Sequence, residues 1–125
     1  MRRAGLVAAA LLFAACQTAR VPPEDRQAYN AALRTLAHDP EAGSEALREF
    51  VARRPKSSLA DDATLRLAEA CIEAGDDDEA VRRLAWLVRT HPEGDRSDAA
   101  RILLARLQRA RGSTAAAYRT SFAVR

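Results

Sequence analysis

Residues able to perform acid–base, nucleophilic or metal chemistry are few in this 125-residue chain, and they are scattered along it. His38 and His91 each lie near a proline at the expected end of a helix, where histidine can offset the helix dipole. No calcium-loop spacing follows the acidic run at 76–78, and no serine has a nearby base in the sequence. We therefore predict that the protein is not an enzyme and has no catalytic residue, metal site or cofactor.

The clearest chemical signal is at Cys16. Arg2 and Arg3 begin the chain, an uncharged apolar run covers residues 4–15, and Cys16 follows directly. This is the three-part form of a secretory signal, and the run is too short for a permanent membrane-spanning helix. The small residues before Cys16 resemble the lipobox of bacterial lipoproteins. The resemblance implies that residues 1–15 are a signal peptide and that Cys16 becomes lipidated, with fatty acids such as palmitate.

The same resemblance implies a place in the cell envelope. In bacterial lipoproteins an Asp directly after the lipidated cysteine commonly signals retention at the inner membrane, whereas this chain has Gln17. We therefore expect a lipid anchor that holds the protein at the periplasmic face of the outer membrane. The alternative is an ordinary secretory signal that is cut near Ala15, which would give a secreted, non-lipidated protein.

The charge of the mature chain argues against nucleic acid as a partner. Without Arg2 and Arg3, 18 basic residues face 17 acidic residues, so the mature chain is nearly neutral. The charges are unevenly distributed, however. Residues 17–95 hold eleven basic and sixteen acidic residues, whereas residues 96–125 hold seven arginines and one acid. The chain is therefore acidic first and basic last.

The composition of the chain and the residues typical of helix ends predict helices. Alanine and leucine dominate the apolar residues and aromatic residues make up only 5%, which favours close-packed helices over sheets. Gly75 and Gly112 suit helix C-termini, Asp76 begins a capping-box pattern, and Ser58 and Ser97 are further N-cap candidates. An apolar helical stripe includes Cys71, which is therefore expected to be buried. We predict helices over residues 25–38, 41–54, 59–74, 77–91, 98–111 and 114–124.

A repeat of 37 residues organises these helices. Pro55 and Pro92 are separated by this distance, and so are Gly75 and Gly112. Apolar and alanine positions agree at the same offset, which indicates a repeated helix–turn–helix unit. One helical hairpin cannot bury its own apolar face, so the units are expected to stack.

The middle unit resembles the tetratricopeptide repeat. Leu67 and Ala68 match the large–small pair of that repeat, Ala80 its small residue where two helices cross, and Pro92 its terminal proline. The linking phrase over residues 55–63 looks most like repeats of outer-membrane assembly lipoproteins and of the periplasmic protein that works with the Tol–Pal system. The resemblance implies an all-α protein, a right-handed α-α superhelix of about three hairpins over residues 25–125, after a tether at 16–24.

In such repeats the first helix of each unit lines the concave face, which supplies the candidate partner-binding residues. They are Asp62, Leu65, Glu69, Ile72 and Glu73 in the middle unit, and Ala99, Ile102, Arg106 and Arg109 in the last. Glu69 and Arg106 occupy equivalent positions, and two interpretations remain open. They form a salt bridge between repeats, or they belong to a groove with an acidic half and a basic half for a peptide or partner helix.

Trp86 is the remaining partner-binding candidate. On helix 77–91 the apolar residues Ala80, Leu84 and Leu87 share one face, and Trp86 falls on the opposite side among charged residues. Trp with Arg is the composition of interface hot spots, although arginine stems also shield surface tryptophans by stacking on them.

These features together predict a lipid-anchored periplasmic adaptor of the outer membrane that binds another envelope protein or peptide, as part of an envelope assembly complex. A pilotin-type helper of a secretion or pilus pore is the alternative role within this class. An enzyme with an unrecognised site and a purely structural anchor are the rival classes.

Overall fold

The computed structural model describes residues 20–112 and 119–120, and helices dominate them. The elements are α1 (Pro23–His38), α2 (Pro40–Arg53), α3 (Ala60–Glu73), α4 (Asp77–Thr90) and α5 (Asp95–Ala110). No strand occurs in this part of the chain, and the predicted all-α class is confirmed. The sixth predicted helix, 114–124, lies outside the described residues except for Arg119 and Thr120.

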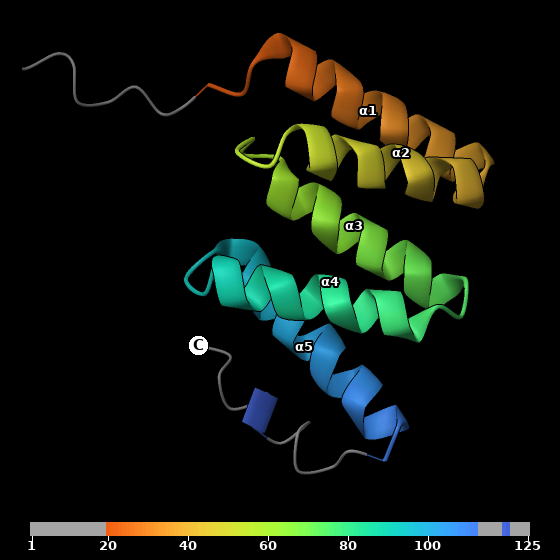
Figure 1. Cartoon of the computed structure of the whole chain (residues 1–125), viewed down its shortest axis with the longest axis vertical. Coiled ribbons are helices and arrows are strands. Elements are labelled where there is room, and N and C mark those ends of the chain that lie inside the picture. Colours follow the sequence, from red (N-terminus) through yellow and green to blue (C-terminus); the bar gives the residue numbers. More distant parts are fainter. Residues whose placement is uncertain (1–19, 113–118, 121–125) are drawn as a thin grey trace, which may run out of the picture.

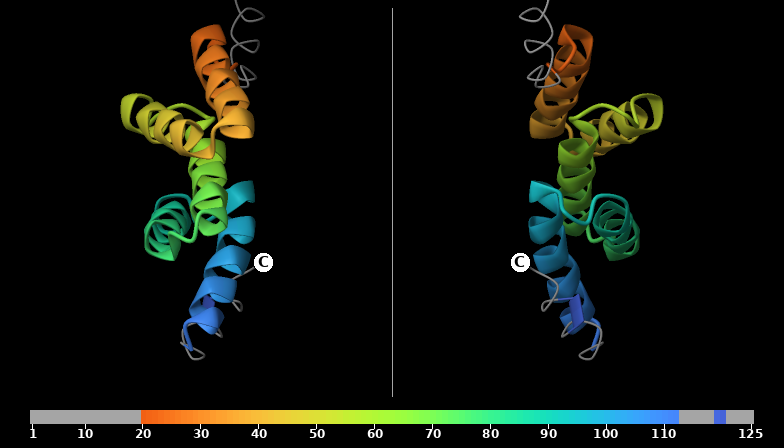
Figure 2. Two further views of the ribbon diagram at one scale, coloured as in Figure 1. Left: turned by 90° about the vertical axis from the view of Figure 1, so that its right-hand side faces the viewer. Right: turned by 90° about the vertical axis from the view of Figure 1, so that its left-hand side faces the viewer.

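The helices form a stack in which each one packs on the next along the chain. Contacts join α1 to α2, α2 to α3, α3 to α4 and α4 to α5, with a smaller contact between α3 and α5 (Figure 1). Figure 2 shows that α1, α3 and α5 lie on one side and that α2 and α4 lie on the other. We call these two sides the α1–α3–α5 face and the α2–α4 face. This arrangement is a helical-repeat superhelix.

Prolines and aspartates define where the helices begin. Pro23 and Pro40 stand in the first turns of α1 and α2, where a missing backbone N–H is harmless. The side chain of Asp39 caps α2 by accepting from the backbone N–H of Ala42 at 3.0 Å. Asp76 does the same for α4, accepting from the N–H of Glu79 at 3.1 Å. These caps satisfy donors that have no partner within their own helix.

Two glycines end helices as predicted. Gly75 has φ +80° and Gly112 has φ +76°, a left-handed conformation that other residues adopt only with strain. After α3, the N–H of Gly75 donates to the carbonyl of Ile72 and the N–H of Asp76 donates to that of Cys71. This bonding pattern is a Schellman motif, and it turns the chain directly into α4.

The two serines predicted as N-caps do not cap helices. Helix α5 begins at Asp95 with Gly94 as its N-cap, and α3 has Leu59 in that place. Ser97 instead lies fully buried inside the first turn of α5, and its hydroxyl donates to the carbonyl of His91. The prediction was wrong because Ser97 bonds the end of α4 across a short turn, so α5 starts three residues early.

The core is a continuous layer of alanine and leucine between the helices. Its fully buried members come from α2, α3, α4 and α5: Leu47, Ala63, Leu67, Ala68, Ala80, Leu84, Leu87 and Ala100. Cys71 is 3% exposed and belongs to the same cluster, which confirms that it is a buried residue. Burial raises the pKa of its thiol, so Cys71 lacks the thiolate character of a reactive cysteine.

Helices α1 and α2 approach each other most closely at Gly43. A Cβ atom at this position would lie 2.2 Å from the Cα of Leu36, which is backbone and has no room to move. The equivalent residue one repeat later is Ala80, which is fully buried. Each hairpin therefore crosses at a residue with a small side chain or none.

Candidate functional site

The predicted site residues fall into three groups in the structure. Cys16, the predicted lipidation site, lies outside the described residues. Asp62, Glu69 and Glu73 are on α3, and Arg106 and Arg109 are on α5, so these five come from helices of the α1–α3–α5 face (Figure 2). Trp86 is on α4, one of the two helices of the α2–α4 face.

Glu69 and Glu73 line a small pocket between α1 and α3. Leu33 and Leu36 of α1 form its apolar wall, and its volume is about 220 Å³. Glu73 is exposed and Glu69 is half-buried. Glu69 pairs with Arg66 of its own helix, one turn away, at 3.2 Å. Arg66 also lines the pocket, which therefore holds two acids and one base beside an apolar wall.

Asp62 has a structural partner. Its carboxylate forms an ion pair with the guanidinium of Arg96 on α5, and its side chain is about one-quarter exposed. This pair joins the first helix of the middle repeat to the first helix of the last repeat. Asp62 is therefore engaged within the molecule, unlike the exposed carboxylate of Glu73.

Arg106 and Arg109 form the basic part of the same face. Both are exposed on α5, one turn apart, and neither has an ion pair with any described residue. Ile102, one turn before Arg106, is 43% exposed and is the most exposed large apolar side chain of the described residues. The salt bridge between Glu69 and Arg106, one of the two sequence-based interpretations, is not formed, because Glu69 bonds Arg66 instead.

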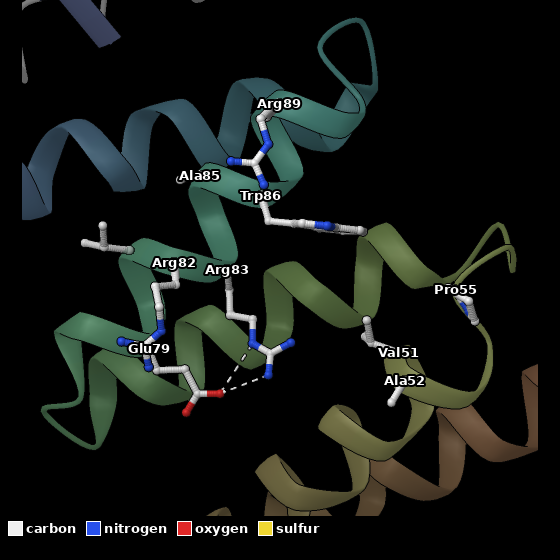
Figure 3. A pocket seen from close by; sticks show the side chains of 10 residues that line it. Val51, Ala52, Pro55, Glu79, Arg82, Arg83, Ala85, Trp86 and Arg89 are labelled. Carbon is white, nitrogen blue, oxygen red and sulfur yellow. Dashed lines mark hydrogen bonds and ion pairs between the residues drawn. The ribbon is translucent and has the colours of Figure 1, made fainter.

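Trp86 is half-buried in a groove on the α2–α4 face. The groove has a volume of about 750 Å³ and is lined by Val51, Ala52, Pro55, Glu79, Val81, Arg82, Arg83, Ala85, Trp86 and Arg89. Figure 3 shows the indole extending from α4 toward the side that carries Val51 and Pro55. The opposite side of α4 packs in the core, as predicted, and Trp86 is also partly buried against the core cluster.

Glu79 connects the two helices that border the groove. It accepts hydrogen bonds from Arg48 of α2 at 2.9 and 2.7 Å and from Arg83 of α4 at 3.3 and 3.2 Å. Hydrogen bonding to Arg48, helped by Arg83, lowers the pKa of Glu79 to about 2 despite its burial. The sequence placed charged residues around Trp86 but did not reveal this cluster, since Arg48 is 31 residues away from Glu79 in the chain.

The two hairpins are closed by equivalent contacts at their ends. Arg54 and His91, 37 residues apart, are the C-cap residues of α2 and α4. Arg54 pairs with Asp25 at 3.0 Å, and Nε2 of His91 lies 3.3 Å from Asp61. The ring of His91 also meets the ring of Trp86, with centroids 5.9 Å apart. His91 thus closes its repeat and helps to hold Trp86 in place.

Neither a metal centre nor a membrane helix is found in the part of the chain that the structure describes. Within residues 20–112 and 119–120, no three histidine, cysteine or acidic residues are grouped to hold a metal ion. Over the same residues, no helix has the length and apolarity needed to cross a membrane.

The stacked hairpins and their charged, grooved surfaces define a helical-repeat protein of the kind that binds other proteins. The family model of the tetratricopeptide repeat-like domain matches residues 17–121. The chain therefore belongs to the tetratricopeptide repeat-like family, whose members are interaction modules. Neither the curated proteins nor the solved structures gave a match to the chain.

Proposed function

We propose that this protein is a lipid-anchored adaptor at the periplasmic face of the outer membrane, where it binds another envelope protein. The anchor is the fatty acylation of Cys16, and Gln17 directs the protein to the outer membrane. The repeat domain is the part that holds the partner. An envelope assembly complex is the setting we favour, and a pilotin-type helper of a secretion or pilus pore is the alternative within the same class.

The charge division of the α1–α3–α5 face carries the proposed adaptor role. The exposed Glu73 and the half-buried Glu69 lie in a recess on α3, whereas Arg106 and Arg109 extend from α5. A partner segment with a basic and an acidic end would match this order. Such complementarity sets orientation and partner choice more than raw affinity.

The anchor is tested by Cys16→Ser. We expect this variant to leave the membrane fraction, or to remain as an uncut precursor, because no cysteine remains to receive the lipid. Fractionation and mass spectrometry of the mature amino terminus measure the two outcomes. An unmodified amino terminus at or after Cys16 in the wild-type protein would contradict the lipid anchor. Recovery of the lipidated protein with the inner membrane would reject only the role of Gln17.

The adaptor role is tested by photo-crosslinking in the native envelope. A photoreactive residue at Glu73 or Arg106, on the α1–α3–α5 face, is expected to give an adduct with one defined protein that mass spectrometry identifies. The matched control places the same residue at Glu49, which is exposed on α2 of the α2–α4 face. No adduct from either test position, or the same adducts from the control, would count against binding at this face.

A further inference from the structure

The groove on the α2–α4 face has an apolar floor that the chain leaves open. Val51 of α2 and Val81, Ala85 and Trp86 of α4 are all only partly buried there. Trp86 is the single tryptophan of the chain. A half-buried indole beside aliphatic side chains in a concave site is the usual centre of a binding hot spot.

The groove also has an excess of positive charge. Three arginines line it, against one acid, Glu79. Arg83 is bonded to Glu79, which is itself shared with Arg48. Arg82 and Arg89 are exposed, and neither forms an ion pair with a described residue. These two guanidinium groups remain for an acidic ligand.

The positions of Arg82 and Arg89 determine the spacing of the acidic groups that a ligand would need. They lie four residues before and three residues after Trp86, so they flank the indole by one turn on each side of the same helix surface. Seven residues of helix separate them by about 10 Å along the axis. An extended peptide spans this distance in about three residues, so carboxylates close to either side of an apolar side chain over Trp86 would reach the two arginines.

The chain itself does not supply this ligand. Residues 1–19 and 113–125, the two ends outside the described helices, contain no aspartate or glutamate. The occupant must therefore bring its acids from another molecule. A concave, apolar-floored groove also suits a protruding side chain better than the surface of a bilayer.

We propose that the α2–α4 groove binds a short acidic segment of a partner protein, in which an apolar side chain is flanked by carboxylates. The apolar side chain packs on Trp86 and Val51, and the carboxylates pair with Arg82 and Arg89. This surface is separate from the α1–α3–α5 face, so the protein would hold partner segments on both faces. The inference does not depend on the lipid anchor.

The fluorescence of the single tryptophan gives a direct assay. The purified full-length chain in a non-ionic detergent is titrated with a capped peptide of sequence Glu-Glu-Leu-Phe-Glu-Glu, and the emission of Trp86 is followed. We expect a saturable blue shift, since the apolar side chains exclude water from the indole. The same peptide with lysine for every glutamate, or with alanine for leucine and phenylalanine, is expected to give no saturation.

Charge reversal tests the two rim arginines. The double variant Arg82→Glu with Arg89→Glu is expected to raise the dissociation constant for the acidic peptide by about tenfold or more. The matched control is Arg26→Glu with Arg34→Glu, two exposed arginines of α1, which is expected to bind as the wild type does. Ala52→Glu, at an exposed position in the groove, also brings an acid to the site and should weaken binding.

Several results would overturn the proposal. Binding of the double variant within twofold of the wild type, or equal binding of the lysine peptide, would remove the role of the arginines. If the emission of Trp86 shifts to the blue with vesicles of anionic phospholipid but not with the acidic peptide, the groove is a lipid-contacting surface. Sedimentation showing a dimer that the double variant dissociates would make a second copy of the chain the occupant.

Discussion

At the scale of single residues, Glu79 is a buried carboxylate that joins two helices. It is 9% exposed and is bonded to Arg48 and Arg83 from two different helices. A helical wheel of α4 could place it on the same side as Trp86, but the wheel holds no information about which helix lies beside that side. Glu79 is bonded to Arg48 of α2, and Arg48 could not be predicted as its partner because the spacing of 31 residues does not follow the repeat.

The cluster predicts a pH dependence of stability. The pKa of Glu79 is lowered to about 2 in the folded protein from an ordinary value near 4.5, so the folded state favours the carboxylate. The resulting stabilisation, up to about 3 kcal/mol, is present above pH 4.5 and is lost as the pH falls toward 2. Glu79→Gln should unfold more easily than the wild type at pH 7, and the difference should shrink on acidification.

Urea unfolding followed by Trp86 fluorescence at several pH values measures this difference. Glu49→Gln serves as the control, because Glu49 forms an exposed pair with Arg53 on α2 and exposed pairs contribute little. A gap between wild type and Glu79→Gln that stays constant from pH 7 to pH 3 would mean that the Glu79 carboxylate is not specially stabilised.

At the scale of elements, the ends of the helices were predicted best where one residue type has one physical role. Gly75 and Gly112 have the positive φ that ends a helix, and Asp76 caps the next one. Asp39 was missed as a cap, although Pro40 follows it directly at the first helical position. Ser97 was misassigned, since a serine looks the same in sequence whether it caps a helix or bonds the preceding turn.

The close crossing of α1 and α2 at Gly43 predicts whether an alanine there raises or lowers the free energy of unfolding. Gly43→Ala should lower the free energy of unfolding by about 1–3 kcal/mol, because the new methyl group would overlap the backbone at Leu36. Alanine in place of glycine inside a helix ordinarily stabilises by about 0.5–1 kcal/mol. Gly75→Ala is the comparison, since its Cβ would meet no atom within 4 Å and only backbone strain of about 1–2 kcal/mol acts there. A more stable Gly43→Ala variant would show that the helices can move apart.

At the scale of the whole molecule, the repeat spacing predicted the stack but not the environment of equivalent residues. Leu65 and Ile102 are 37 residues apart, yet Leu65 is 7% exposed and Ile102 is 43% exposed. Leu65 is on α3 in the middle of the stack, whereas Ile102 is on α5 at the end of the described helices. Glu69 and Arg106 are likewise equivalent in sequence without forming a pair, since Glu69 bonds Arg66 of its own helix. A sequence offset identifies equivalent positions but not how completely each is covered.

The two arginines of α5 supply the prediction at this scale. Arg106→Glu with Arg109→Glu should change the free energy of unfolding by no more than about 0.5 kcal/mol, since both are exposed and unpaired among the described residues. Crosslinking of a partner to the α1–α3–α5 face should fall, and its dependence on salt should weaken. Arg53→Glu with Lys56→Glu carries the same change of charge at two exposed residues outside both proposed binding sites and is the control. Unchanged crosslinking in a destabilised double variant would make the two arginines structural.

The stack of sequential contacts has a consequence for the order of folding. Each helix touches its chain neighbours, so contact order is low and a repeat can fold without waiting for distant segments. Synthesis at roughly 5–20 residues per second releases the end of α2 about 2–7 seconds before the end of α4. During that interval the first hairpin is complete while Arg48 still lacks Glu79, its acceptor on α4. Because one hairpin cannot bury its own apolar face, we expect the first hairpin to become stable only when α3 and α4 cover it and Glu79 reaches Arg48.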